Sequence, residues 1–259
     1  MLEPEAKNYL RELVSAHEFL NGYKRWCLWL VDIDPNKLQE LKEIEKRVKK
    51  VKNIRSESTR VTTQKLADYP QLFGEIRQPK SNYILIPRHS SENRKYIPLG
   101  FLTPDFIVSD SCLSIDNASI YHFGILHSEM HMAWVKSTCG RIKSDFRYSN
   151  EIVYNNFPWP KENDKNAIAI ESAAQHILDV RQEFSSNSLS SLYDPLIMPP
   201  KLIKAHKALD KAVDLAYRKQ PFLNEANRVV YLFDLYEKYS ADLFSTGIII
   251  KKVKASKLI

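Results

Sequence analysis

The chain has 259 residues, of which 44% are hydrophobic and 27% charged, and its net charge is +7 at pH 7. This composition is typical of a globular protein and excludes a disordered chain or a repeat array. No apolar run approaches the roughly eighteen residues of a membrane span, and the N-terminus has no signal-sequence core, so we expect a cytoplasmic protein.

The first 160 residues alternate between strand-like and turn-like segments around two helices. Apolar, β-prone runs predict strands near residues 24–32, 73–77, 83–88, 96–102, 106–110 and 113–116. From Pro35 the stretch NKLQELKEIEKRVKKVK has apolar residues at helical spacing, which predicts one helix. A second helix is predicted from about Ile120 to Ser137, with Gly140 as its stop, and strand- or loop-like segments follow as far as Pro160.

After Pro160 the pattern becomes helical. Residues 164–184 have apolar residues at helical spacing, Pro199-Pro200 opens a second helix, and a third helix starts near Asn224. We therefore expect an α+β chain, in which a mixed or antiparallel, sheet-rich domain over residues 1–160 is followed by a helical bundle over residues 161–259.

Basic residues gather in a few segments rather than being spread evenly. Eight basic residues against three acidic ones lie between Lys42 and Arg60, and smaller basic groups occur at 80–95, at 136–147 and in the tail KKVKASKLI. Several such runs in one chain favour binding to the phosphates of a nucleic acid, although any single run is also what a solvated surface presents.

The segment RIKSDFR at 141–147 has a charged residue at every second position. In an extended strand these side chains share one face. Lys and Arg donate hydrogen bonds to the major-groove edge of guanine, and Asp accepts one from cytosine. The pattern therefore predicts base reading by Lys143, Asp145 and Arg147. The alternative is an ordinary strand edge with an internal ion pair.

Two loops carry further candidate DNA ligands. The polar, basic loop at 88–96 lies between two apolar strands and suits contacts with phosphates, although a plain hairpin loop is the alternative. Asp110 and Ser111 end a strand and are predicted as additional base-reading residues. The predicted phosphate ligands are Arg88, Ser90, Ser91, Asn93, Arg94, Lys95 and Arg141.

No catalytic motif is recognisable. The chain has no closely spaced glycines for a cofactor loop, and NFPW at 156–159 has Phe157 where the Asn/Asp-Pro-Pro-aromatic motif of adenine methyltransferases has its first proline. His127 and His131 in HSEMH stand at a spacing that binds zinc on a helix, but Ser128 replaces the glutamate of the zincin motif. We therefore expect no catalytic residue and no metal, and we expect both histidines near the core. A small metalloenzyme is the alternative.

Several blocks, in order along the chain, together resemble one known family. RWCLWLVDI (25–33), FGEIRQP (73–79), YILIPRHSSENRKYIPLGFL (83–102), YHFGILHSEMHMAW (121–134), CGRIKSDFRYS (139–149) and IVYNNFPWP (152–160) are similar to the target-recognition domain of the MmeI-like, type IIL restriction–modification enzymes. LYDPLIMPPKLIKAHKALDKAVDLAY (192–217) is similar to the helical C-terminal region of the same family. The resemblance extends from about Tyr9 to about Tyr239.

This resemblance implies a function. Such enzymes are single polypeptides that join a nuclease domain, a helical spacer and an adenine methyltransferase, which uses S-adenosylmethionine, to this recognition region; cleavage would also use Mg²⁺. It implies that Lys143 and Asp145 read one G·C pair and that Arg147 reads a neighbouring base. We therefore expect a fragment, without a cofactor of its own, that reads double-stranded DNA for a methyltransferase in the same polypeptide. The alternative is a free-standing specificity subunit.

Overall fold

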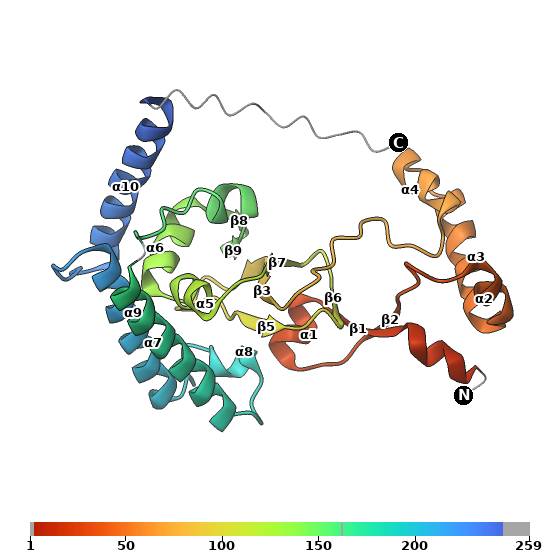
Figure 1. Ribbon diagram of the computed structural model, residues 1–259, viewed down its shortest axis with the longest axis horizontal. Coiled ribbons are helices and arrows are strands. Elements are labelled where there is room, and N and C mark those ends of the chain that lie inside the picture. Colours follow the sequence, from red (N-terminus) through yellow and green to blue (C-terminus); the bar gives the residue numbers. More distant parts are fainter. Residues whose placement is uncertain (1–2, 162, 246–259) are drawn as a thin grey trace. The chain divides into compact units, whose positions relative to one another are not determined.

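A computed structural model describes residues 3–161 and 163–245 (Figure 1). The expected mixed α+β class is confirmed: three small sheets lie in the N-terminal part of the chain, and a helical region follows. The basic tail at 251–259 lies outside the described residues. Among the helices of the described ranges, none is both long and apolar enough to cross a membrane.

The chain folds into two compact units, each built from two segments. Unit 1 comprises Met1–Ile86 and Gly100–Asn117, and unit 2 comprises Pro87–Leu99 and Ala118–Ile259. The domain boundary near residue 160 remains a prediction, and residues on both sides of it pack together in unit 2.

Unit 1 contains two of the three sheets. In the first, of order β2-β1-β6, β1 pairs antiparallel to β2 and parallel to β6; the second has the order β5-β3-β7. Strands were predicted at β2, β3, β5, β6 and β7, whereas β1 was not, and the predicted strand at 73–77 is a loop. The elements are η1 (Pro4–Tyr9), β1 (Leu10–Val14), α1 (Ala16–Asn21), β2 (Trp26–Leu28), α2 (Pro35–Glu40), α3 (Lys42–Ser56), α4 (Val61–Lys65), η2 (Leu66–Asp68), β3 (Tyr83–Pro87), β5 (Gly100–Leu102), β6 (Phe106–Val108) and β7 (Cys112–Asp116).

The helix predicted from Pro35 is two helices, because the backbone leaves the helical region at Leu41 (φ −85°, ψ 80°). Leu41 is nevertheless buried, in a cluster with Leu30 and Ile44. The apolar spacing thus identified residues that pack together, but it did not reveal the break between α2 and α3.

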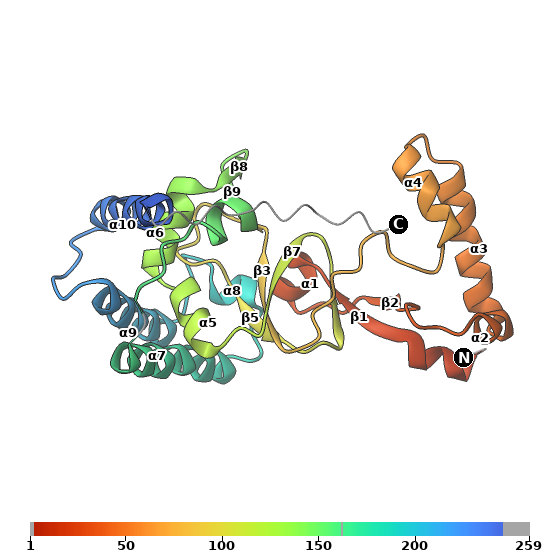
Figure 2. The ribbon, with the colours of Figure 1, turned by 45° about the horizontal axis from the view of Figure 1, so that its top comes forward.

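Unit 2 contains the third sheet and the long helices. The predicted helices after residue 160 are confirmed as α7, α9 and α10; α7 and α9 lie side by side (Figures 1 and 2). The elements are β4 (His89–Ser90), α5 (Ile120–Leu126), α6 (Glu129–Thr138), β8 (Gly140–Ile142), β9 (Asp145–Arg147), η3 (Asn150–Tyr154), α7 (Asp164–Glu183), α8 (Leu189–Leu192), α9 (Pro200–Tyr217) and α10 (Glu225–Ser245).

The single helix predicted over 120–137 is wrong in one respect, because it is broken into α5 and α6. His127 ends α5, and Ser128 caps α6 by accepting a hydrogen bond from the backbone N–H of His131. Serine competes for backbone hydrogen bonds in this way, which favours helix starts over helix interiors. The predicted inner residues of this stretch are all buried: Phe123, Leu126, Met130, Ala133 and Trp134.

Gly124 permits α5 to pack closely on α7. A Cβ atom at this position would lie 2.7 Å from Cγ2 of Ile170 and 3.2 Å from Cβ of Ala174. Gly124→Ala should therefore destabilise unit 2 by about 1–2 kcal/mol, because the overpacking cost of about 1–3 kcal/mol exceeds the gain of helix propensity. Urea denaturation measures the change.

The control for this prediction is Gly140→Ala, which introduces a Cβ no closer than 4.0 Å to its neighbours and should be near neutral. Adding Ile170→Leu to Gly124→Ala removes the methyl group that clashes and should restore part of the loss. Equal stability of Gly124→Ala and the wild type would show that α5 and α7 separate without cost.

A buried polar cluster joins the helices of unit 2. Arg181 of α7 donates hydrogen bonds to the carbonyl of Leu99 (2.6 Å) and, through Nε, to the Tyr193 hydroxyl (2.8 Å). Asp210 of α9 accepts from the Tyr96 hydroxyl (2.6 Å) and from the backbone N–H of Glu129 (2.7 Å). We use the name polar cluster for Tyr96, His127, Arg181, Tyr193, His206 and Asp210.

Candidate nucleic-acid interface

The third sheet, of order β4-β9-β8, brings together the two segments in which most DNA ligands were predicted. β9 pairs antiparallel with β4, where Arg147 lies opposite His89, and antiparallel with β8, where Asp145 lies opposite Ile142. The loop at 88–95 and the segment 140–147 are therefore neighbours in one small sheet. Figure 2 shows the hairpin of β8 and β9.

The single extended strand on which the shared face of 141–147 depended does not form. β8 ends at Ile142 and β9 begins at Asp145, and Lys143 and Ser144 form the turn between them. Lys143 has φ 55°, in the left-handed region that hairpin turns require and that usually selects Gly, Asn or Asp. Because the turn residue is a lysine, the sequence carried no hairpin signal.

The hairpin does not place the four charged residues of 141–147 on one face. Side chains that lie directly opposite each other across strands share a face, and successive residues alternate. One face, which we call the reading face, carries His89, Ile142, Asp145 and Arg147, all exposed to solvent. Lys143 is exposed in the turn at the end of the hairpin.

Arg141 lies on the opposite face, together with Ser90 and Phe146. Its guanidinium covers the ring of Phe146, 4.2 Å from the centroid, and donates a hydrogen bond to the carbonyl of Ser144 (2.8 Å). Phe146 is only 2% exposed. Arg141 thus holds the turn to the buried side of the hairpin, and it does not share a face with Asp145 and Arg147 as the predicted strand required.

Sequence analysis missed two residues of the reading face, His89 and Ile142. Ile142 is 46% exposed although it is apolar, and His89 occupies the strand position opposite Arg147. The signal that would have found them is strand register, which depends on pairing between segments far apart in the sequence.

The predicted phosphate ligands of the loop differ in exposure. Asn93 and Lys95 are exposed, while Arg88, Ser91 and Arg94 are half-buried. Ser90 is 4% exposed, contrary to the expectation of a surface ligand. It is buried because it pairs with Phe146 on the inner side of the sheet.

Other side chains of unit 2 hold this loop in place. Arg94 donates a hydrogen bond to the Ser190 hydroxyl (3.1 Å), and Lys95 pairs with Glu129 (2.5 Å). Burial lowers the pKa of the Arg94 guanidinium, a shift that the charges of Asp194 and Asp145 oppose. The backbone N–H of Glu92 donates to the Asp145 carboxylate (3.3 Å), which links the loop to the reading face.

Asp110 and Ser111 belong to unit 1, at the turn between β6 and β7. Asp110 is exposed. The Ser111 hydroxyl is used within the turn, because it accepts a hydrogen bond from the backbone N–H of Ala16 (3.1 Å) and bonds to the Ser109 hydroxyl (2.9 Å). Their role in base reading remains a prediction.

The two histidines of HSEMH are core residues. Their expected placement on one helix face is wrong, because His127 is the C-terminal cap of α5 and His131 belongs to α6. Nε2 of His131 bonds to the Tyr148 hydroxyl (2.9 Å), and burial lowers the pKa of His131 to about 3. His127 contacts Nη2 of Arg181 (3.1 Å). Within residues 3–161 and 163–245, no three His, Cys, Asp or Glu side chains group as metal ligands would.

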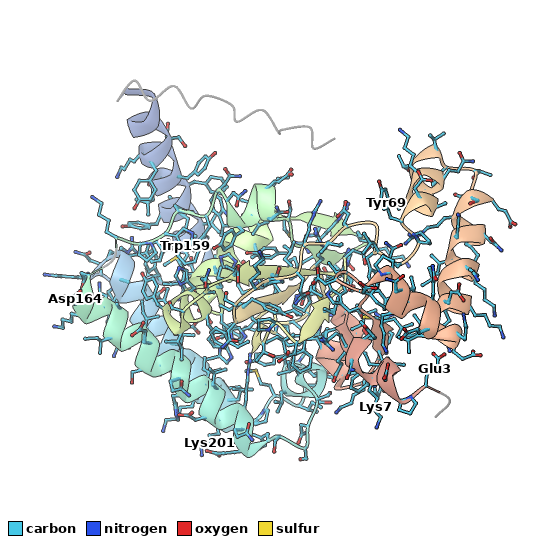
Figure 3. The ribbon with its side chains drawn as sticks, turned by 45° about the vertical axis from the view of Figure 1, so that its right-hand side comes forward. Glu3, Lys7, Tyr69, Trp159, Asp164 and Lys201 are labelled. Atoms are coloured by element: carbon cyan, nitrogen blue, oxygen red, sulfur yellow. The ribbon has the colours of Figure 1, made fainter. Side chains whose placement is uncertain are left out.

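The segment NFPW follows a π-helical turn, η3, in a stretch that was predicted to be strand- or loop-like. The Asn156 amide donates hydrogen bonds to the carbonyls of Glu151 (2.8 Å) and Ile152 (3.0 Å). The Phe157 ring packs against His131 and Trp159, with centroids 4.6 and 5.4 Å away; Figure 3 labels Trp159. This segment therefore has a packing role.

Comparison with known proteins assigns this architecture to one family. Residues 1–161 match the family described as MmeI, target recognition domain, and residues 162–244 match the MmeI C-terminal domain. The chain belongs to the MmeI family. The family resemblance of the sequence blocks is thereby confirmed.

Two related proteins are much longer than this chain. DNA methyltransferase A of Bacillus subtilis (strain 168) is 40% identical over 235 residues, which are 91% of this chain and 27% of that protein. The structure of the type IIL restriction–modification enzyme MmeI in complex with DNA matches with a TM-score of 0.90 and 41% identity, over 93% of this chain and 32% of that chain. The chain thus spans about a third or less of these MmeI-family relatives.

Proposed function

We propose that this chain recognises a specific sequence of double-stranded DNA through the reading face. The observation that carries the proposal is the β4-β9-β8 sheet, in which exposed residues able to pair with base edges adjoin a loop rich in polar and basic side chains. The MmeI structure, with which the chain shares 41% identity, contains DNA. A two-stranded β-ribbon is narrow enough to enter the major groove.

The reading face and the adjoining turn at Lys143 together combine donors with one acceptor. Asp145 and Arg147 are two residues apart on β9, so their side chains point to the same side, about 6.6–6.8 Å apart along the strand. In the proposed complex, Asp145 accepts from the amino group of cytosine, Lys143 donates to the guanine of the same pair, and Arg147 reads a neighbouring base.

Phosphate contacts would fix the register of the protein on the duplex. We assign them to Arg88, Ser91, Asn93, Arg94, Lys95 and Arg141. Ser90 would join them only if the loop opened, because its hydroxyl is buried. Asp110 and Ser111 of unit 1 remain proposed as a second base-reading turn.

The methyl transfer itself would be carried out by another part of a longer polypeptide. The relatives, of which this chain spans 27% and 32%, favour that arrangement over a separate specificity subunit. S-adenosylmethionine, and Mg²⁺ for cleavage, would bind in that other part, because the six glycines of this chain include no closely spaced pair for a cofactor loop.

The proposal is tested by sequencing methylated adenines in DNA from cells that express the full-length protein. For the exchange Lys143→Glu with Asp145→Arg, we expect one G·C position of the methylated motif to become C·G. For Lys143→Gly, which suits the left-handed backbone of the turn, we expect that position to be relaxed, with a loss of about 1–3 kcal/mol of discrimination.

The control is the double variant Lys207→Gln and Lys211→Gln on α9, which removes charge from exposed positions away from the reading face. It should leave the motif unchanged. An unchanged motif in both hairpin variants would contradict base reading by the hairpin and redirect the search to the loops at 88–96 and 110–111.

A further inference from the structure

We propose that helix α3 of unit 1 provides a second contact with the duplex, in which a basic face binds phosphates without reading their sequence. The proposal rests on the proposed function, since duplex DNA is the partner, but it concerns residues outside the reading face and in the other compact unit. We define the basic face of α3 as Lys42, Lys46, Lys49, Lys50 and Asn53.

The positions of these residues follow the helical repeat. They recur at intervals of three and four residues, so they line one side of α3, and all are exposed. The buried Ile44 and the partly buried Val48 lie on the other side and pack into the apolar cluster of unit 1. α3 therefore presents lysines to solvent along its length.

Most of this charge is not neutralised within unit 1. Lys42 and Lys49 share a single carboxylate, that of Glu45, at 3.7 and 2.8 Å. Lys46 and Lys50 have no ion pair in the part of the chain that the structure describes. Like charges four residues apart destabilise a helix slightly, so this arrangement costs stability rather than providing it. A polyanion bound to the face would remove that cost.

The basic face lies on a braced element. Arg55, on the inner side of α3, donates from Nη1 to the carbonyls of Leu66 (2.9 Å) and Tyr69 (3.1 Å) and from Nη2 to that of Leu72 (2.8 Å). These bonds fasten η2 and the following loop to α3; Figure 3 labels Tyr69. A 15-residue helix is about 22 Å long, and duplex DNA carries one charge per about 1.7 Å, so several phosphates fit along it.

The test is the salt dependence of DNA binding by the full-length protein. We compare the wild type with the double variant Lys46→Gln and Lys50→Gln, using one duplex with the methylated motif and one with a scrambled sequence. Each phosphate contact contributes about 0.9 to the slope of log K against log salt. We expect the slope to fall by up to about 2, with the same severalfold loss of affinity for both duplexes and an unchanged methylated motif.

The matched control is Lys207→Gln with Lys211→Gln, which has the same spacing and the same change of charge on α9. It should leave the slope unaltered. An unchanged slope for the α3 variant, or an equal fall in the control, overturns the proposal, as does a loss of affinity confined to the duplex with the methylated motif. The motif experiment decides the proposed function separately, because it reports on the hairpin and not on α3.

Discussion

Replacing Arg181 with alanine is expected to lower the free energy of unfolding of unit 2 by about 3–5 kcal/mol, because two buried acceptors lose a charged donor and each such loss costs about 1–3 kcal/mol. Arg181 is 9% exposed, and its guanidinium lies 4.8 Å from the ring centroid of Tyr193 and 5.4 Å from that of Phe123. The substitution removes both the charged donors and the volume between these rings.

The main cost comes from the groups left behind. The carbonyl of Leu99 and the hydroxyl of Tyr193 both accept hydrogen bonds from Arg181, and an unpaired buried polar group costs about 1–3 kcal/mol. The Tyr193 hydroxyl also bonds to Nε2 of His206 (2.9 Å), so the loss reaches α9. Arg181 thus connects α7, α9 and the segment before β5.

Urea denaturation followed by circular dichroism measures this effect, as a fall in the midpoint at an unchanged slope. Arg147→Ala is the control, because Arg147 is exposed and such substitutions usually change stability by less than about 0.5 kcal/mol. A loss below about 1 kcal/mol for Arg181→Ala would show that water replaces Arg181 as the hydrogen-bond partner of Leu99 and Tyr193. The polar cluster would then contribute little to stability.

The second large effect is a steep loss of stability in acid. Burial lowers the pKa of His131 to about 3, and it lowers the pKa values of His127 and His206 well below 6.5. The positive charge of Arg181 lowers the pKa values of His127 and His206 further. The folded chain keeps these imidazoles neutral, while the unfolded chain protonates them below about pH 6.5. Stability is therefore fully present above pH 6.5 and falls as the pH drops, by about 1.4 kcal/mol per pH unit for each histidine.

Asp210 acts in the opposite direction. Burial raises its pKa to about 7, so between its unfolded value near 3.8 and pH 7 the folded chain holds a proton that the unfolded chain lacks. The contribution of Asp210 to the free energy of unfolding therefore increases as the pH falls through that range. This increase offsets the loss that about one of the three histidines causes. The expected net slope is on the order of 3 kcal/mol per pH unit below pH 6.5.

Unfolding free energies measured between pH 7.5 and pH 5 test this expectation. His131→Gln keeps a partner for the Tyr148 hydroxyl and removes one titrating group, so the slope should become shallower by about 1.4 kcal/mol per pH unit. His176→Gln changes an exposed histidine of α7 and should leave the slope as it is. If His131→Gln left the slope unaltered, His131 would be accessible to protons in the folded chain.

The sequence alone determined the long helices and the family of this protein. α7, α9 and α10 begin close to the predicted residues, and α7 also ends close to its predicted end, because apolar residues such as Ile177, Leu209 and Leu232 recur at the helical period and local signals mark the helix starts. Such information is local, so it can be read from a short window of residues. The blocks that resemble the MmeI family likewise lie in order along the chain.

Only the tertiary structure decided the candidate site. The turn at Lys143 separates Arg141 from Asp145 and Arg147, and the pairing of β9 with β4 adds His89 to the reading face. The alternation of charges at 141–147 fits a strand and a hairpin equally well. The choice between them follows from the burial of Phe146 and from pairing with a distant segment, and a local pattern contains neither.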